Sequence, residues 1–213
     1  MITIALSFAA AAGAAAAIVA DSGERRHPAY YALKPLTTLL IIGIATTGPL
    51  EGAYTQWVLV ALVFSLAGDV FLMFDSERAF VGGLAGFFVA HLAFVSAFMQ
   101  GVHIPGLTAL PAWLVAIGLY AGAMLFVLLP RAGALKVPVL AYCLVLAAMV
   151  AAAGVRHGAL GDADSLRAVL GALLFMASDS LLGWRRFVGA YRGAQALILS
   201  TYWGAIGLIA WSV

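Results

Sequence analysis

Apolar runs of about twenty residues, separated by short polar segments, recur along the whole chain. A helix rises about 1.5 Å per residue, so about twenty residues cross the roughly 30 Å hydrocarbon core of a bilayer. The pattern therefore predicts an all-α bundle of eight transmembrane helices. We expect these helices over residues 1–20, 33–48, 54–74, 79–100, 107–129, 136–155, 166–184 and 193–213.

Composition narrows the class of protein. Hydrophobic residues make up 65% of the 213 positions and charged residues 9%, whereas soluble domains carry about 25% charged residues. This excludes a water-soluble globule and indicates a multi-pass integral membrane protein, in the inner or plasma membrane if the source is bacterial. We expect a single domain over residues 1–213. The net charge of +2 and the lack of a Lys/Arg-rich segment give no indication of nucleic acid.

Positively charged residues lie unevenly between the predicted helices. Nine fall in the loops of one side and two, Arg156 and Arg167, on the other. The positive-inside rule places the richer side in the cytoplasm, so both termini are predicted to face away from it. The nine residues are Arg25, Arg26, Lys34, Arg78, Arg131, Lys136, Arg185, Arg186 and Arg192. We expect the segment from Arg156 to Ser165 to be a polar loop.

Two lone carboxylates stand near the cytoplasmic ends of predicted helices three and seven. Asp69 lies in the apolar run 65–74 and Asp179 in the run 175–184. An ionisable residue inside a membrane is costly and points to function. Each lies about 7–8 Å inside its helix end, and Lys34 enters from the same side, so we expect the three to converge. Lys34 and Lys136 also open helices two and six, which suggests either a four-plus-four internal repeat or coincidence.

Two carboxyl groups held close together do not both ionise easily. One then serves as an acid and the other as a base, while the Lys34 ammonium would hold one of them ionised. This arrangement suits acid–base hydrolysis of a bond that water attacks slowly. The alternative is that Asp69 and Asp179 pair with Lys34, Arg78 or Arg185 only to stabilise the helix ends.

Three further side chains are candidates for the site. His91 shares a predicted helix face with Phe80 and Phe87, on a helix where Gly83 and Gly86 allow close approach of a neighbour; the alternative for His91 is a packing role. Tyr202, inside helix eight, needs a hydrogen-bond partner if buried. Arg185 would hold a lipid phosphate or act only as a positive-inside signal. The single cysteine, Cys143, excludes an intrachain disulfide and a cysteine-based metal site.

Four motifs in order resemble the YhhN-like family, which includes the animal transmembrane lysoplasmalogenases. They are Lys34-Pro35-Leu36, the stretch 68–73, the stretch 80–91 and the stretch 178–182. The resemblance implies an eight-helix membrane hydrolase. Its substrate would be a lysoplasmalogen, a lysophospholipid with a vinyl ether chain, and its products a fatty aldehyde and glycerophosphoethanolamine or glycerophosphocholine. Phe94 departs from the family pattern, where tyrosine is expected, which puts in doubt any role for a hydroxyl there.

A vinyl ether is hydrolysed by protonating its outer alkene carbon, adding water to the resulting oxocarbenium ion and collapsing the hemiacetal. This needs an acid, a base and stabilisation of the cation. Asp69 and Asp179 supply these roles in an order that stays open, and no metal or other cofactor is required. Lys34 would tune the pair or bind phosphate, and His91 would orient water or a carboxyl.

Two other classes of membrane protein use paired aspartates. An intramembrane aspartyl protease would also need a Pro-Ala-Leu-type motif, which the chain lacks. A proton-coupled transporter or lipid carrier would use the same carboxylates. Its helices are expected to break near the midplane, whereas Gly and Pro here cluster mainly at helix ends. The lipid headgroup and the oligomeric state are not indicated by the sequence.

Overall fold

A computed structural model describes residues 1–21, 27–102 and 111–213. Eight α-helices and two short 3-10 helices form these parts of the chain, which confirms the predicted all-α architecture. The α-helices are α1 (Ile2–Asp21), α2 (Tyr30–Ala45), α3 (Ala53–Phe71), α4 (Glu77–Phe98), α5 (Ala112–Leu128), α6 (Lys136–Leu160), α7 (Ala163–Phe187) and α8 (Ala194–Ala210). The 3-10 helices η1 (Leu129–Arg131) and η2 (Gly133–Leu135) join α5 to α6.

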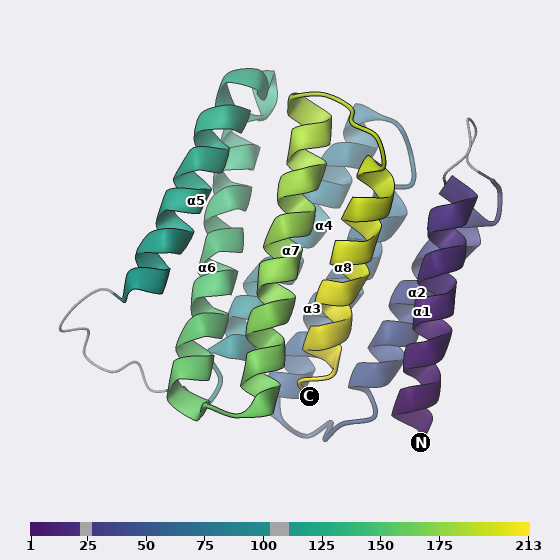
Figure 1. Ribbon diagram of the computed structural model, residues 1–213, viewed down its shortest axis with the longest axis vertical. Coiled ribbons are helices and arrows are strands. Elements are labelled where there is room, and N and C mark those ends of the chain that lie inside the picture. Colours follow the sequence, from purple (N-terminus) through teal and green to yellow (C-terminus); the bar gives the residue numbers. More distant parts are fainter. Residues whose placement is uncertain (22–26, 103–110) are drawn as a thin grey trace.

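Six of the helices are long and apolar enough to cross a bilayer, and α2 and α8 are shorter apolar helices of 16 and 17 residues. At about 1.5 Å per residue, α2 and α8 span about 25 Å. The chain is therefore a multi-pass membrane protein. Both termini lie at the same end of the bundle (Figure 1), while the side of the membrane that they face stays a prediction.

The region between α6 and α7 differs from the predicted loop. Helix α6 continues to Leu160, so Arg156 is helical, and the helix ends at Gly161 in the left-handed conformation (φ 67°). Helix α7 begins directly afterwards, because the Asp162 carboxylate accepts a hydrogen bond of 2.7 Å from the Ser165 backbone N–H. A glycine C-cap and an aspartate N-cap thus leave almost no loop. The predicted helix residues 107–110 and the cations Arg25 and Arg26 lie outside the described residues.

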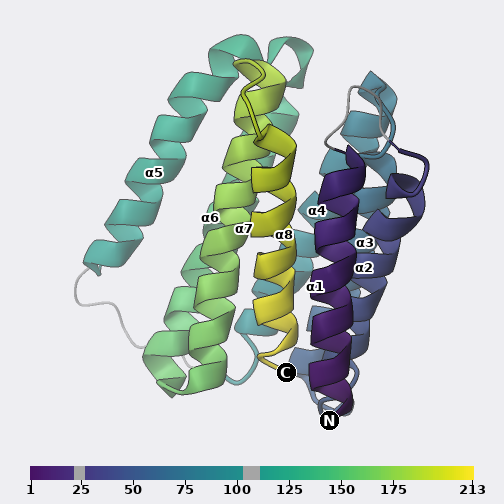
Figure 2. The ribbon, with the colours of Figure 1, turned by 45° about the vertical axis from the view of Figure 1, so that its right-hand side comes forward.

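The helices run roughly parallel or antiparallel to one another (Figures 1 and 2). The main neighbours are α1 with α2, α3 with α4, and α7 with α8, and α4 also packs on α6. Helix α5 lies outside the bundle against α6, from which it leans away toward its start (Figure 2). The division into two four-helix halves stays a prediction.

Glycines let α3 and α4 approach closely, as the sequence predicted for Gly86. A Cβ atom on Gly86 would lie 3.0 Å from the Gly68 backbone nitrogen, and one on Gly68 would lie 2.7 Å from the Phe87 ring. Larger side chains at either position would push the helices apart. The contact holds the helix that carries Asp69 against the helix that carries His91.

Candidate active site

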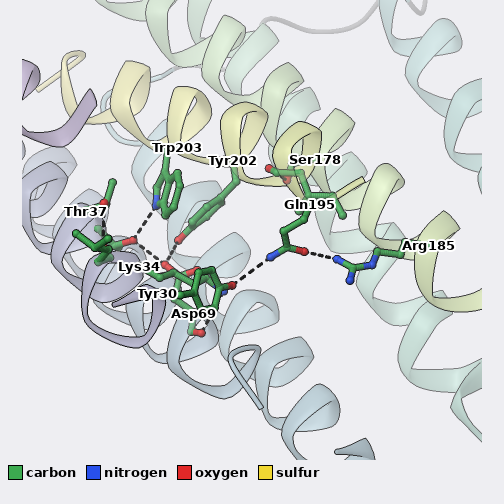
Figure 3. A network of polar contacts seen from close by, with 12 residues as sticks. Tyr30, Lys34, Thr37, Asp69, Ser178, Arg185, Gln195, Tyr202 and Trp203 are labelled. Atoms are coloured by element: carbon green, nitrogen blue, oxygen red, sulfur yellow. Dashed lines mark hydrogen bonds and ion pairs between the residues drawn. The ribbon is translucent and has the colours of Figure 1, made fainter. Parts of the chain in front are cut away.

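Asp69 lies at the centre of a buried polar network near the end of α3. The Lys34 Nζ atom of α2 is 3.3 Å from Asp69 Oδ1 and donates a 3.2 Å hydrogen bond to the Asp69 backbone carbonyl. Hydroxyls of Thr38 and Tyr202 donate to Oδ2 at 2.6 and 2.7 Å. Side chains from α2, α3 and α8 therefore converge on one carboxylate, as Figure 3 shows for Lys34, Tyr202 and Asp69.

Further hydrogen bonds extend from this network in two directions. The Trp203 indole N–H donates to the Thr38 hydroxyl at 3.2 Å, which ties α8 to α2. Toward the end of α7, Gln195 accepts a hydrogen bond from Arg185 and donates one of 3.1 Å to the Tyr30 hydroxyl (Figure 3). Arg185 is thus held in place by an amide from the start of α8.

Asp179 has different partners. The Tyr142 hydroxyl of α6 donates to Asp179 Oδ2 at 2.6 Å, and His91 Nε2 lies 3.6 Å from the same oxygen. Neither ring nitrogen of the fully buried His91 has a hydrogen-bond partner among the described residues. The imidazole packs edge-on against Tyr142 and Phe175, with ring centroids 5.2 and 4.7 Å apart.

The two carboxylates have different hydrogen-bond partners. Among the described residues they share no hydrogen-bond partner. The Phe175 ring lies between the partners of the two carboxylates. Its centroid is 5.5 Å from that of Tyr202, which binds Asp69, and 4.7 Å from that of His91, which lies beside Asp179. Of the residues predicted to converge, Lys34 and Asp69 are in contact, and Asp179 lies beside His91; the convergence of the two carboxylates stays a prediction.

Two adjoining cavities reach this region. An apolar pocket of about 60 Å³ lies between α4, α5, α6 and α7 and has Asp179 and Tyr142 in its wall. A polar pocket of about 320 Å³ lies at the ends of α2, α3, α4, α7 and α8. Leu72, Phe80 and Leu182 line both, so the pockets adjoin. The charged and amide side chains of the polar pocket are Lys34, Asp75, Glu77, Arg185, Arg186 and Gln195.

Sequence reasoning missed two of the carboxylate partners, Thr38 and Tyr142. Thr38 follows Lys34 by one helical turn, so it shares that face of α2, and this spacing was a usable signal. Tyr142 lies in an uncharged part of α6, and only its contact in space with Asp179 identifies it. Within residues 1–21, 27–102 and 111–213, no three His, Cys, Asp or Glu side chains gather as a metal site would need.

The fold and these centres define a helical-bundle membrane protein with ionisable groups buried beside an apolar pocket. The family model that describes the YhhN family matches residues 29–213. The chain therefore belongs to the YhhN family, which confirms the family that the ordered motifs predicted.

Relatives in this family carry enzyme names. The chain is 36% identical to human lysoplasmalogenase TMEM86B over 83% of its own length and 72% of that protein. It is 31% identical to the lysoplasmalogenase of Mycobacterium tuberculosis over 81% of its length and 64% of the relative. No solved structure gives a significant match.

Proposed function

We propose that this protein is a membrane hydrolase that cleaves the vinyl ether bond of lysoplasmalogens, as the names of its relatives indicate. The observation that carries the proposal is the pair of adjoining pockets. One is apolar, with a carboxyl and two phenols among its lining residues, and the other is polar and lined by charged residues of both signs. A lysophospholipid has the same division into one hydrocarbon chain and a charged headgroup, and its ether bond lies where the two meet.

We assign the proton-donor role to Asp179. Its side chain is only 9% exposed, it lines the apolar pocket, and Tyr142 fixes its Oδ2 atom. In its protonated form Asp179 would transfer the proton to the outer alkene carbon of the bound chain. The carbon next to the ether oxygen then becomes an oxocarbenium ion, and the Asp179 carboxylate formed in the same step stabilises that charge.

Water completes the reaction at the same carboxylate. Asp179 takes a proton from the water molecule that attacks the oxocarbenium carbon, as the carboxylates of many glycosidases change from acid to base. The hemiacetal then collapses when its hydroxyl proton is transferred to the glycerol oxygen. The C–O bond on the chain side breaks, and the products are a fatty aldehyde and a glycerophosphodiester. One water is consumed, and Asp179 returns to its starting form.

Asp69 has a positioning role in this proposal. Its carboxylate is already contacted by Lys34, Thr38 and Tyr202, and Lys34 also donates to its backbone carbonyl. It holds the Lys34 ammonium, which lines the polar pocket, and through Tyr202 it fixes the aromatic ring that packs on Phe175. His91, 3.6 Å from Asp179, would orient that carboxyl or the attacking water.

The proposal is tested by hydrolysis in D₂O with purified protein in detergent. Protonation of the alkene carbon by a group that exchanges with solvent places one deuterium on the carbon beside the aldehyde. We expect that label at early times and no product from the matched saturated-ether lipid. Release of a fatty acid from an ester lysophospholipid, with no aldehyde from the vinyl ether, would contradict the assigned reaction.

A further inference from the structure

The apolar pocket is shallow compared with a lipid chain. On α7 the lining residue farthest from the polar pocket is Met176, three residues before Asp179, and on α6 it is Ala147, five residues after Tyr142. At about 1.5 Å per residue, the pocket therefore extends only about 5–8 Å beyond the proposed proton donor. One lipid chain spans about half of the hydrocarbon core of a bilayer, or roughly 15 Å. The rest of a bound chain must lie outside the pocket.

Helix α5 is the wall of this pocket that faces lipid. It lies outside the bundle against α6 (Figure 2), and it lines the pocket with Tyr120, Ala121, Met124 and Leu128. Of its residues only Leu128 is buried. The helices that form the other walls pack on one another, since α6 contacts both α4 and α7. A chain that leaves the pocket for the bilayer is therefore expected to pass beside α5.

Close contacts hold α5 near its two ends. Near its end the Leu128 side chain packs on α7, where a Cβ atom on Gly183 would lie 3.1 Å from it. Near its start the Trp113 ring packs on α6, where a Cβ atom on Gly154 would lie 2.8 Å from that ring. The middle of α5 is linked to α7 by a hydrogen bond of 2.8 Å, which the Tyr120 hydroxyl donates to the Ser180 hydroxyl.

The Tyr120–Ser180 hydrogen bond crosses the lipid-facing side of the pocket at the depth of Asp179. Both residues line the pocket, and Ser180 directly follows Asp179. Tyr120 is 40% exposed, so its ring can swing away without opening the packed core. The Ser180 hydroxyl donates to the Met176 carbonyl at 2.7 Å and keeps that partner when Tyr120 moves. Because one hydrogen bond contributes little net stability, this contact can open each time a chain passes.

Gly118 and Gly122 lie on either side of Tyr120 in α5. A Cβ atom on either glycine would have no atom within 4 Å, so close packing does not require a glycine at these positions. Glycine inside a helix weakens it relative to alanine. The two glycines therefore allow the middle of α5 to bend while its ends stay attached to α6 and α7.

We propose that the lipid enters and leaves the apolar pocket sideways, through a portal between the middle of α5 and α7. During the reaction the far part of its hydrocarbon chain stays in the bilayer. The Tyr120–Ser180 hydrogen bond closes the portal when no chain occupies it. The occupant is the chain of a single-chain lipid, because the pocket is continuous with the portal and too short for the whole chain. The inference rests on the proposed function for the identity of that lipid.

The test links α5 to α7 across the portal in protein reconstituted in phosphatidylcholine vesicles. A Cys143→Ala background removes the native thiol from the pocket wall. Tyr120→Cys and Ser180→Cys are then joined by a short bis-methanethiosulfonate reagent, since the length of a tyrosine side chain exceeds the roughly 4 Å between Cβ atoms that a direct disulfide allows. The substrates are two lyso-alkenyl phospholipids with the same headgroup, one with a long chain and one with a butenyl chain that fits inside the pocket.

We expect the link to lower kcat/KM for the long-chain lipid by about tenfold, and a reductant that cleaves the link to restore it. The butenyl lipid, which can enter through the adjoining polar pocket, should change by less than about twofold. The matched controls are the two single-cysteine variants treated with the same reagent. Unchanged turnover of the long-chain lipid in the linked protein would overturn the portal. An equal loss for both lipids, or an equal loss in a single-cysteine variant, would also overturn it.

A binding experiment separates the portal from the proposed reaction. Saturated-ether analogues with a long and with a butyl chain are added to the linked and to the reduced protein, and their association rates are compared. If no lipid yields aldehyde but the link slows association of the long-chain analogue alone, the proposed reaction is wrong and the portal stands. If aldehyde forms and the link changes neither turnover nor association, the portal is wrong and the proposed reaction stands.

Discussion

Replacing Lys34 by methionine tests how much of the bundle's stability depends on the buried Lys34–Asp69 pair. Lys34 is 3% exposed and Asp69 is 1% exposed. Methionine keeps the length of the side chain but leaves the carboxylate without its cation. Thr38 and Tyr202 still donate to it, at 2.6 and 2.7 Å. Breaking a buried ion pair on one side costs about 3–5 kcal/mol.

For a chain of 213 residues, that loss corresponds to a fall in Tm of roughly 6–20 °C. The assay is thermal unfolding in detergent, followed by tryptophan fluorescence. The matched control is Lys136→Met, at an exposed lysine that opens α6, with an expected change within about 0.5 kcal/mol. The double variant Lys34→Met/Asp69→Asn removes the uncompensated charge and should regain much of the loss. The reasoning is refuted if Lys34→Met unfolds at the same temperature as the control.

Three further predictions concern packing, catalysis and acid stability. Gly86→Ala should lower Tm, because the new Cβ would meet the α3 backbone at 3.0 Å; an unchanged Tm would mean that the helices separate freely. Tyr142→Phe should lower kcat by about 10- to 100-fold with little change in Tm, since a hydrogen bond to a charged Asp179 contributes about 1.5–3 kcal/mol. The hydrogen bond from the Ser165 backbone N–H lowers the pKa of Asp162. The cap therefore contributes its full stability above the pKa that this carboxyl has in the unfolded chain. That contribution is lost as the pH falls through the lower pKa of the folded state. Asp162→Asn should flatten that acid limb of a Tm–pH curve, and an unaltered limb would show that the cap contributes nothing.

The number and order of the helices were predictable because each must bury about twenty apolar residues in lipid. The end of α6 was not predictable. Arg156 is a charged residue and was expected to begin a loop, but contacts with other helices keep it within α6. Its guanidinium lies 4.0 Å from the centroid of the Tyr54 ring and donates to the Gln100 carbonyl at 2.8 Å. A charged side chain with such partners continues a helix that the hydropathy pattern alone would end.

The candidate site was also predictable only in part. Asp69, Asp179 and Lys34 were identifiable because they are ionisable residues inside apolar runs. Such residues are costly inside a membrane and indicate a function. Their grouping was not identifiable, because it depends on which helices are neighbours. Tyr202 of α8 reaches Asp69 of α3, which is distant in sequence, whereas Tyr142 reaches Asp179 from α6, the helix directly before α7. A single sequence gives depth along each helix but not the pairing of helix faces.

Aldehyde release from a lyso-alkenyl phospholipid by purified protein tests the central claim most directly. Wild type is compared with Asp179→Asn and with Asp69→Asn, which separates the proposed proton donor from the positioning residue. Our account predicts aldehyde from wild type, none from Asp179→Asn, and reduced release from Asp69→Asn that tracks its loss of stability. Wild-type turnover by a folded Asp179→Asn variant would contradict it. Proton-dependent lipid uptake into vesicles without any product would instead favour a transporter.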